Sequence, residues 1–245
     1  MPLSFDLPKE QLKAYRGRTP RPDDFDAYWD TALAELEAGE PEAELKDSGF
    51  GSRVARCFDL TFRGIDGARQ YAKLVVPRKP GGPCPALLTF HGYSGASGDW
   101  SSLLAFAAEG FAVAALDCRG QGGRSEDPGG VPGSTFRGHI VRGLDGRPED
   151  LLFRKIYLDT VQLARVVAGL PEVDADRMGA FGGSQGGGLT VACAALYPKI
   201  RCLAPTFPFL SDYQRVWEMD QAQASYEELK LCFRHHDPRH EREVA

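Results

Sequence analysis

The sequence of 245 residues has no long hydrophobic run, no excess of basic residues and no basic, apolar leader at its start. Its longest apolar runs, such as residues 111–116, fall far short of the ~20 residues that a membrane-spanning helix needs. The net charge of −5 offers nucleic acid no basic face to bind. These absences predict a protein with no membrane partner, no nucleic-acid partner and no secretory signal.

Cysteine pairs with the CxxC spacing of metal sites and redox motifs are also missing. The sequence holds six cysteines: Cys57, Cys84, Cys118, Cys193, Cys202 and Cys232. None of them clusters with histidines, and several lie in apolar strand or helix patterns. We interpret them as buried free thiols in preference to a disulfide framework or a metal site. Together with the missing secretory signal, this predicts a reducing, cytoplasmic location and no bound metal.

The first fifty residues differ from the rest, and we expect a helical extension over residues 1–50 in front of a core over residues 51–245. Asp23 can cap a helix, and Gly39 is typical of its C-terminal end. Between them apolar residues recur at helical spacing: Phe25, Tyr28, Trp29, Ala32, Leu33 and Leu36. This stripe either covers the main domain or makes contacts between subunits, and we favour the first.

The core region alternates between strand and helix patterns. Residues 54–62 and 70–76 are strand-like, and the glycines between them indicate a hairpin turn. Four further apolar runs predict buried strands: residues 86–90, 111–116, 177–181 and 202–207. Helical stretches separate these strands: residues 100–109, 151–170 and 185–196. Continuous apolar strands that alternate with helices are typical of a mostly parallel, doubly wound α/β sheet.

One motif points to the chemistry. Gly182, Ser184 and Gly186 form a Gly-x-Ser-x-Gly pattern between a predicted strand and a predicted helix. In such a nucleophile elbow the serine has a strained backbone, and the flanking glycines avoid collisions across the turn. The hydroxyl of Ser184 then lies at a helix N-terminus, which favours negative charge. The backbone N–H of Gln185 would supply one half of an oxyanion hole.

The loop after residues 86–90 supports this interpretation. In α/β hydrolases this loop provides the second oxyanion N–H, and here it begins with His91-Gly92-Tyr93. The backbone N–H of Tyr93 is therefore the candidate donor, and its ring is a candidate lining of the acyl pocket. His91 precedes the serine in the chain, so we do not assign it as the general base. A phosphate-binding turn or a purely structural turn are the alternatives for the glycine-rich segment, but no GKS or GKT follows it.

Together these residues resemble carbohydrate esterase family 7, which contains acetyl xylan esterases and cephalosporin-C deacetylases. The segments that carry the resemblance are residues 25–29, 91–93, 119–123, 141–144 and 182–187. The elbow alone occurs in many hydrolases, whereas its combination with the RGQGG and HGY segments is specific. The resemblance covers essentially the whole chain and implies the α/β-hydrolase fold.

The resemblance implies a serine esterase that removes acetyl groups from small O-acetylated substrates, such as acetylated xylo-oligosaccharides and cephalosporin C, through an acyl-enzyme. It also implies no cofactor, a cytoplasmic location and a homo-oligomer, often a hexamer. Arg119 and Gln121 would support the site structurally, as Gly182 and Gly186 would. We favour this role for Arg119 over direct catalysis, because a buried arginine can tie a loop to a carboxylate.

Too little chain follows Ser184 to complete a triad in the order serine, acid, histidine. Two further strand and helix units would take roughly 30 residues or more each. Only the helix-like residues 213–219 and 226–233 and a charged tail follow the last predicted strand. We therefore expect the triad Asp and His, and the last strands of the sheet, to be absent from this chain. It would then be a shortened form or a degenerate copy.

Some polar residues near the C-terminus are weaker candidates for the missing acid and base: His235, His236, His240, Asp212 and Asp220. Their polar surroundings favour solvated or packing roles instead. Two alternative functions also stay open. One is another α/β hydrolase, a peptidase or thioesterase, that uses the same serine. The other is a non-catalytic copy kept for subunit association or ligand binding.

Overall fold

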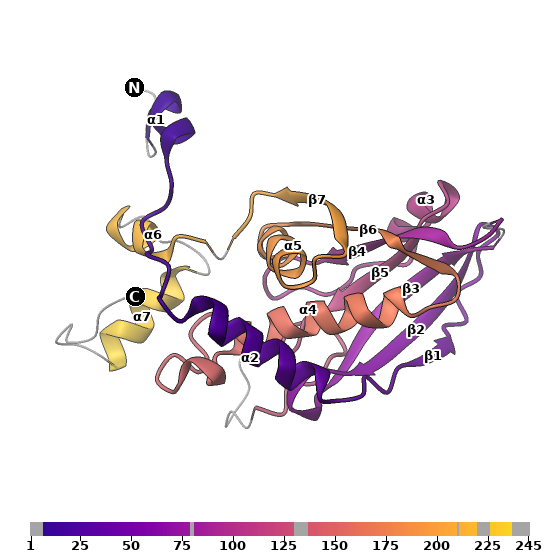
Figure 1. The fold of residues 1–245 in the computed structure, drawn as a ribbon, viewed down its shortest axis with the longest axis horizontal. Coiled ribbons are helices and arrows are strands. Elements are labelled where there is room, and N and C mark those ends of the chain that lie inside the picture. Colours follow the sequence, from indigo (N-terminus) through magenta and orange to yellow (C-terminus); the bar gives the residue numbers. More distant parts are fainter. Residues whose placement is uncertain (1–6, 79–80, 130–136, 210, 220–225, 237–245) are drawn as a thin grey trace. The chain divides into compact units, whose positions relative to one another are not determined.

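The computed structural model describes residues 7–78, 81–129, 137–209, 211–219 and 226–236 of the chain. The chain divides into two compact units (Figure 1). One unit combines Met1–Phe25 with Asp212–Ala245, and the other is Asp26–Ser211. All seven strands of the sheet lie in the second unit.

A mixed sheet forms the centre of the unit Asp26–Ser211. Its strands are β1 (Glu44–Asp47), β2 (Ala55–Arg63), β3 (Arg69–Pro77), β4 (Cys84–Phe90), β5 (Ala112–Asp117), β6 (Val173–Gly183) and β7 (Ile200–Thr206). Their order across the sheet is β1-β2-β3-β5-β4-β6-β7. The pairs β5–β4, β4–β6 and β6–β7 are parallel, and the other pairs are antiparallel. The predicted α/β sheet with an antiparallel hairpin is confirmed.

The hairpin of β2 and β3 places Arg63 opposite Arg69, and the short 3-10 turn Ile65–Gly67 joins the two strands. Asp66 has a φ of 59° in this turn, a left-handed conformation that aspartate tolerates better than most residues. Strand β1 was not predicted. All four of its residues are exposed, so it has no apolar alternation that the sequence could show.

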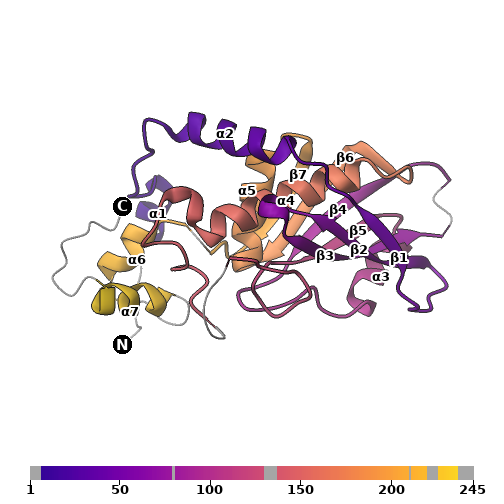
Figure 2. The same ribbon diagram turned by 90° about the horizontal axis from the view of Figure 1, so that it is seen from below.

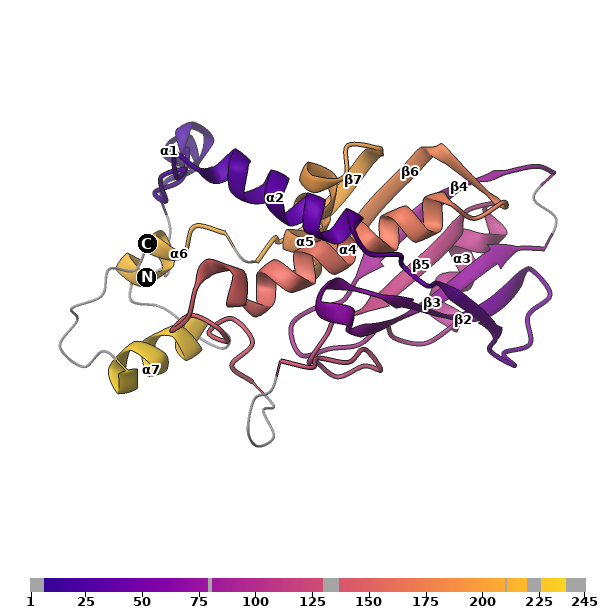
Figure 3. The ribbon, with the colours of Figure 1, turned by 60° about the horizontal axis from the view of Figure 1, so that its bottom comes forward.

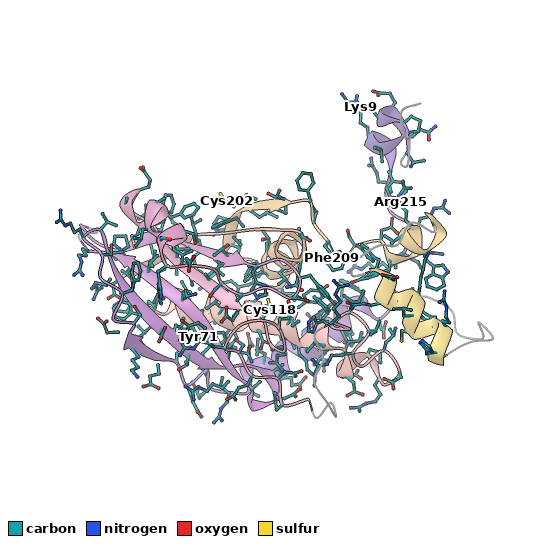
Figure 4. All side chains as sticks on the ribbon, turned by 180° about the vertical axis from the view of Figure 1, so that it is seen from behind. Lys9, Tyr71, Cys118, Cys202, Phe209 and Arg215 are labelled. Atoms are coloured by element: carbon teal, nitrogen blue, oxygen red, sulfur yellow. The ribbon has the colours of Figure 1, made fainter. Side chains whose placement is uncertain are left out.

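The parallel strands differ in how well they are covered. Every residue of β5 is buried, as expected for a strand packed on both faces. In β7 the residues between Ile200 and Pro205 are exposed, so the expectation of a buried strand is wrong there. The expectation of buried thiols is also wrong for Cys202, which is exposed, whereas Cys118 is buried (Figure 4).

Helices cover both faces of the sheet. They are α2 (Phe25–Glu37), α3 (Ser101–Ala108), α4 (Leu152–Ala168) and α5 (Gln185–Leu196). Helix α3 packs Leu103 and Ala107 against Val113 and Ala115 of β5. It lies on the opposite side of the sheet from α2 and α4 (Figure 2). None of the described helices is both long and apolar enough to cross a membrane.

Helix α2 lies along α4 (Figure 3). Its buried residues Ala32 and Leu36 pack against Leu158 and Val161 of α4. The predicted apolar stripe therefore covers the main domain, which is the interpretation that we favoured over a contact between subunits.

The described residues of the unit Met1–Phe25 and Asp212–Ala245 form three short helices: α1 (Lys9–Ala14), α6 (Tyr213–Met219) and α7 (Glu227–His236). The Tyr15 hydroxyl donates a hydrogen bond to the Asp212 carboxylate. The Arg215 guanidinium lies over the Tyr15 ring, 4.7 Å from its centroid. These contacts join the N-terminal segment to the start of α6.

Candidate active site

The site is built where two parallel strands end side by side. Strands β4 and β6 are neighbours, and Phe90 at the end of β4 is paired in register with Gly182 near the end of β6. The carboxyl ends of parallel strands lie at the same edge of a sheet, where α/β proteins bind ligands. The loop that begins at His91 and the turn at Ser184 therefore lie next to each other.

The turn at Ser184 has the strained geometry that the motif predicts. Ser184 has φ 57° and ψ −119°, a combination that residues other than glycine rarely adopt. A Cβ atom at Gly186 would collide with the carbonyl oxygen of Phe90, and one at Gly182 would lie 2.6 Å from the carbonyl oxygen of Gly186. Both obstacles are backbone atoms, which cannot rotate away. The two glycines are therefore required by this turn.

The strain at Ser184 is held by hydrogen bonds from both directions. Its backbone N–H donates to the carbonyl oxygen of Thr206 at 2.9 Å. Its carbonyl oxygen accepts from the N–H of Phe209, also at 2.9 Å. The end of β7 and the segment after it thus fix the turn, while Ser184 itself is exposed.

Helix α5 starts at Gln185, directly after the serine. The first N–H groups of a helix have no partner within the helix, and they carry the positive end of its dipole. The backbone N–H of Gln185 is therefore available to a negative charge beside the Ser184 hydroxyl. The Gln185 side chain is fully buried, and it pairs with the side chain of Gln121.

Gln121 links the two loops of the site. Its Oε1 accepts the backbone N–H of Ser94 at 2.8 Å, and its Nε2 donates to Oε1 of Gln185 at 2.9 Å. The Gln185 side chain returns a hydrogen bond from Nε2 to Gln121 Oε1 at 3.2 Å. One amide thus contacts both the loop of Tyr93 and the start of α5, the two segments with the candidate oxyanion donors.

His91 is not arranged as a base. Its Nε2 accepts the backbone N–H of Cys118 at 2.9 Å, and its Nδ1 lies 2.7 Å from the carbonyl oxygen of Gly92. These contacts fit the neutral tautomer that carries its proton on Nδ1. Burial lowers the pKa of His91, which also keeps the ring neutral. With both nitrogens in use, the side chain anchors its loop to the end of β5.

Arg119 lies in the core below the site. Its guanidinium is fully buried and contacts the Asp159 carboxylate of α4 at 2.5 and 2.6 Å. It also donates to the carbonyl oxygen of Ile65 at 3.1 Å. Burial acts to lower the pKa of Arg119, but the charge and hydrogen bonds of Asp159, together with the charges of Asp127 and Asp66, raise it overall, so the guanidinium stays charged. The contacts are those of a residue that ties a loop to a carboxylate.

The side chain of Tyr93 lies in an aromatic cluster. Its hydroxyl accepts the backbone N–H of Ile140 at 3.1 Å. Its ring stacks nearly parallel to Phe153, packs edge-on against His139 at a centroid distance of 5.1 Å, and meets Phe209 at 5.7 Å. The sequence interpretation missed His139, Phe153 and Phe209. Of the segments that carry the family resemblance, residues 141–144 lie nearest in sequence to His139 and Ile140, but the resemblance did not indicate their contact with Tyr93.

The structure describes some of the C-terminal candidates for an acid and a base. His235 is an exposed residue of α7, and Asp212 is bound to Tyr15, both within the unit that contains the two termini. His236 is the last residue of α7. His240 and Asp220 lie outside the described residues.

Comparison with known proteins identifies the lineage. The family model of acetyl xylan esterase (AXE1) matches residues 1–245. The chain belongs to the acetyl xylan esterase family. Acetyl xylan esterase 1 from Thermoanaerobacterium sp. JW/SL YS485 has 53% sequence identity and a TM-score of 0.93, over 97% of this chain and 74% of that one. The acetyl xylan esterase from Paenibacillus sp. R4 has 34% identity and a TM-score of 0.89, over 96% and 75%.

A curated relative is more distant. Acetyl esterase Axe7A of Xylanibacter ruminicola is 27% identical over 212 residues. The match covers 83% of this chain but only 46% of that protein. The chain thus spans about half the length of this relative and three quarters of the length of the two solved structures. Those two structures confirm the predicted family and its α/β-hydrolase fold.

Proposed function

We propose that this chain carries the nucleophile and the oxyanion hole of a serine carboxylesterase that removes acetyl groups from small O-acetylated substrates. The main support is the turn at Ser184, where an exposed serine with a positive φ precedes a helix and adjoins the loop of Tyr93. Family membership supports the acetyl group as the acyl part, since the relatives bear the names of acetyl esterases.

The proposed reaction has two steps. Ser184 Oγ attacks the acetyl carbonyl carbon, its proton passes to a base, and the carbonyl oxygen becomes an oxyanion held by the N–H groups of Tyr93 and Gln185. The carbon–oxygen bond to the alcohol breaks, and the alcohol leaves with a proton from the same base. Water then attacks the acetyl-serine with the base's help and releases acetate and free Ser184.

We propose that residues 1–245 supply neither that base nor its orienting acid. His91 is occupied on both nitrogens, and both His91 and His139 precede Ser184, against the order that α/β hydrolases use. Asp212 accepts hydrogen bonds from the Tyr15 hydroxyl and the backbone N–H of Arg18, and His235 is an exposed residue of α7. Without a base the hydroxyl stays protonated, and the loss of a triad member lowers the rate by several orders of magnitude.

The finer assignments follow the family resemblance. Acetylated xylo-oligosaccharides and cephalosporin C are the substrates that we propose, in a cytoplasmic homo-oligomer. We further propose that Arg119 and Gln121 support the site without contacting substrate, because their contacts are with Asp159, Ser94 and Gln185.

The test compares the chain with a chimaera that adds the part of the Thermoanaerobacterium relative that this chain does not cover. We expect the chimaera to hydrolyse p-nitrophenyl acetate, the 245-residue chain to be slower by several orders of magnitude, and Ser184→Ala to abolish the activity. Hydrolysis of aminoacyl amides or thioesters with none of the acetate would favour the peptidase or thioesterase alternative. A folded chimaera that is inert toward all three would favour a non-catalytic copy.

A further inference from the structure

His139 is a buried polar residue whose ring nitrogens have no hydrogen-bond partner among the described residues. Only 2% of its surface is exposed, and neither ring nitrogen has a hydrogen-bond partner within the described part of the chain. An unsatisfied buried polar group is destabilising, so such groups in native proteins require an explanation, often a bound ligand or water. We therefore expect the imidazole to bind a hydrogen-bonding partner from outside the described residues.

The ring is neutral and can offer two kinds of hydrogen bond. Burial, together with the nearby Arg142 charge, lowers the pKa of His139 to about 4, although the Asp127 charge acts in the opposite direction. A neutral imidazole has one N–H donor and one nitrogen acceptor. A hydroxyl group is a suitable partner because its oxygen can accept from the ring N–H, or the hydroxyl can donate to the unprotonated ring nitrogen.

The position of His139 is fixed beside the proposed oxyanion loop. Its ring packs against that of Tyr93, and the next residue, Ile140, donates its N–H to the Tyr93 hydroxyl. The segment that carries both residues is anchored by the ion pair of Arg142 with Asp127. His139 thus adjoins the residue whose backbone N–H would hold the oxyanion.

The chemistry of an acetyl ester decides which part of the substrate His139 can bind. The acetyl methyl group is apolar, and the carbonyl oxygen would be taken by the amides of Tyr93 and Gln185. The remaining polar groups are on the alcohol part. We propose that His139 binds a hydroxyl of the alcohol part of the ester, and so favours acetylated sugars over esters of simple alcohols. This inference rests on the proposed function.

The test is a binding titration that does not depend on turnover. The Ser184→Ala variant, labelled with 15N at histidine, is titrated with monoacetylated xylobiose or with ethyl acetate, which has no hydroxyl. We expect the ring-nitrogen signals of His139 to shift saturably with the sugar ester and to stay unchanged with ethyl acetate. No shift with the sugar ester, or equal shifts with both, would overturn the proposal.

Two variants in the same background separate binding from packing. His139→Phe keeps the ring and removes its nitrogens, and should weaken binding of the sugar ester by about 3- to 10-fold, the worth of one hydrogen bond, without affecting ethyl acetate. Phe153→Leu disturbs the packing on Tyr93 but no polar group, and should leave the preference between the ligands unchanged. An equal loss for both ligands in His139→Phe would show that His139 only positions Tyr93.

The proposed function can fail independently. If a fluorophosphonate does not label Ser184 in the chimaera but the His139 signals still respond to the sugar ester, the serine mechanism is wrong and the binding site stands. Labelling of Ser184 without any response at His139 removes only the inference about His139.

Discussion

The carboxyl ends of β4 and β6 and the outer strand β7 are adjacent in one sheet, yet they are built very differently. At the first, glycines pack against backbone with no space for a methyl group, and Ser184 is held on both sides by hydrogen bonds. At β7, most side chains are exposed and Leu203 keeps 47% of its surface in solvent. Substitutions should therefore be costly in the first region and tolerated in the second.

The largest effect is expected at the buried ion pair under the site. Asp159→Ala leaves the Arg119 guanidinium charged and unpaired in the core, which should cost about 3–5 kcal/mol of the free energy of unfolding in urea. Arg63→Ala breaks the exposed pair with Glu42 and should cost less than about 1 kcal/mol. Similar losses in the two variants would mean that the burial of the Arg119–Asp159 pair adds nothing to its contribution to stability.

The next largest loss of stability is expected when a methyl group is added at the turn of Ser184. Gly186→Ala sets a Cβ against the carbonyl oxygen of Phe90 and should cost about 3 kcal/mol or more. The matched control is Gly183→Ala, where the nearest atom outside the adjacent residues lies 3.9 Å away, and it should cost less than about 1 kcal/mol. Urea unfolding of both variants measures the difference, and tolerance of Gly186→Ala would disprove the collision.

Acid should also lower the free energy of unfolding through the buried His139. Its pKa is about 4 in the folded chain and near 6.5 when unfolded, so only the unfolded state gains a proton between these values. Stability should thus fall by about 3 kcal/mol as the pH drops from about 6.5 to 4. The comparison is unfolding of the chain and of His139→Phe across this range, and an unchanged slope in the variant would contradict the assignment.

The smallest effect belongs to the outer strand. Leu203→Ala in β7 should change the free energy of unfolding by no more than about 0.5 kcal/mol, because the side chain is half exposed. Leu88→Ala in β4 removes a fully buried side chain and should cost about 2–5 kcal/mol. If the Leu203 variant lost as much stability as the Leu88 variant, another surface must cover β7 in solution.

A feature could be predicted from the sequence when the residues that cause it are close together in the chain. The turn at Ser184 was predictable because Gly182 and Gly186 solve a local steric problem. The exposure of β7 was not, because an apolar strand is buried only if other elements cover it. The contact of His139 with Tyr93 was also missed, since it joins residues from separate loops and leaves no spacing pattern.

The strands and helices of the core could also be predicted where their pattern is local in the sequence. Alternating and periodic patterns predicted β2, β3 and α2 to α5, and continuous apolar runs predicted β4 to β7, although the prediction began β6 at residue 177 and the strand begins at Val173. Strand β1 escaped notice because an exposed edge strand has no reason to alternate. The resemblance through the RGQGG and HGY segments supplied what periodicity could not, namely the family.

The central claim is that Ser184 is a nucleophile held ready by its strained turn. The direct measurement is mass spectrometry of peptides from the chimaera after reaction with a fluorophosphonate. We predict a single adduct on Ser184, formed at least about 1,000-fold faster than in the 245-residue chain, since a base must activate the hydroxyl. An adduct on another residue, or none in a folded chimaera, would contradict the claim.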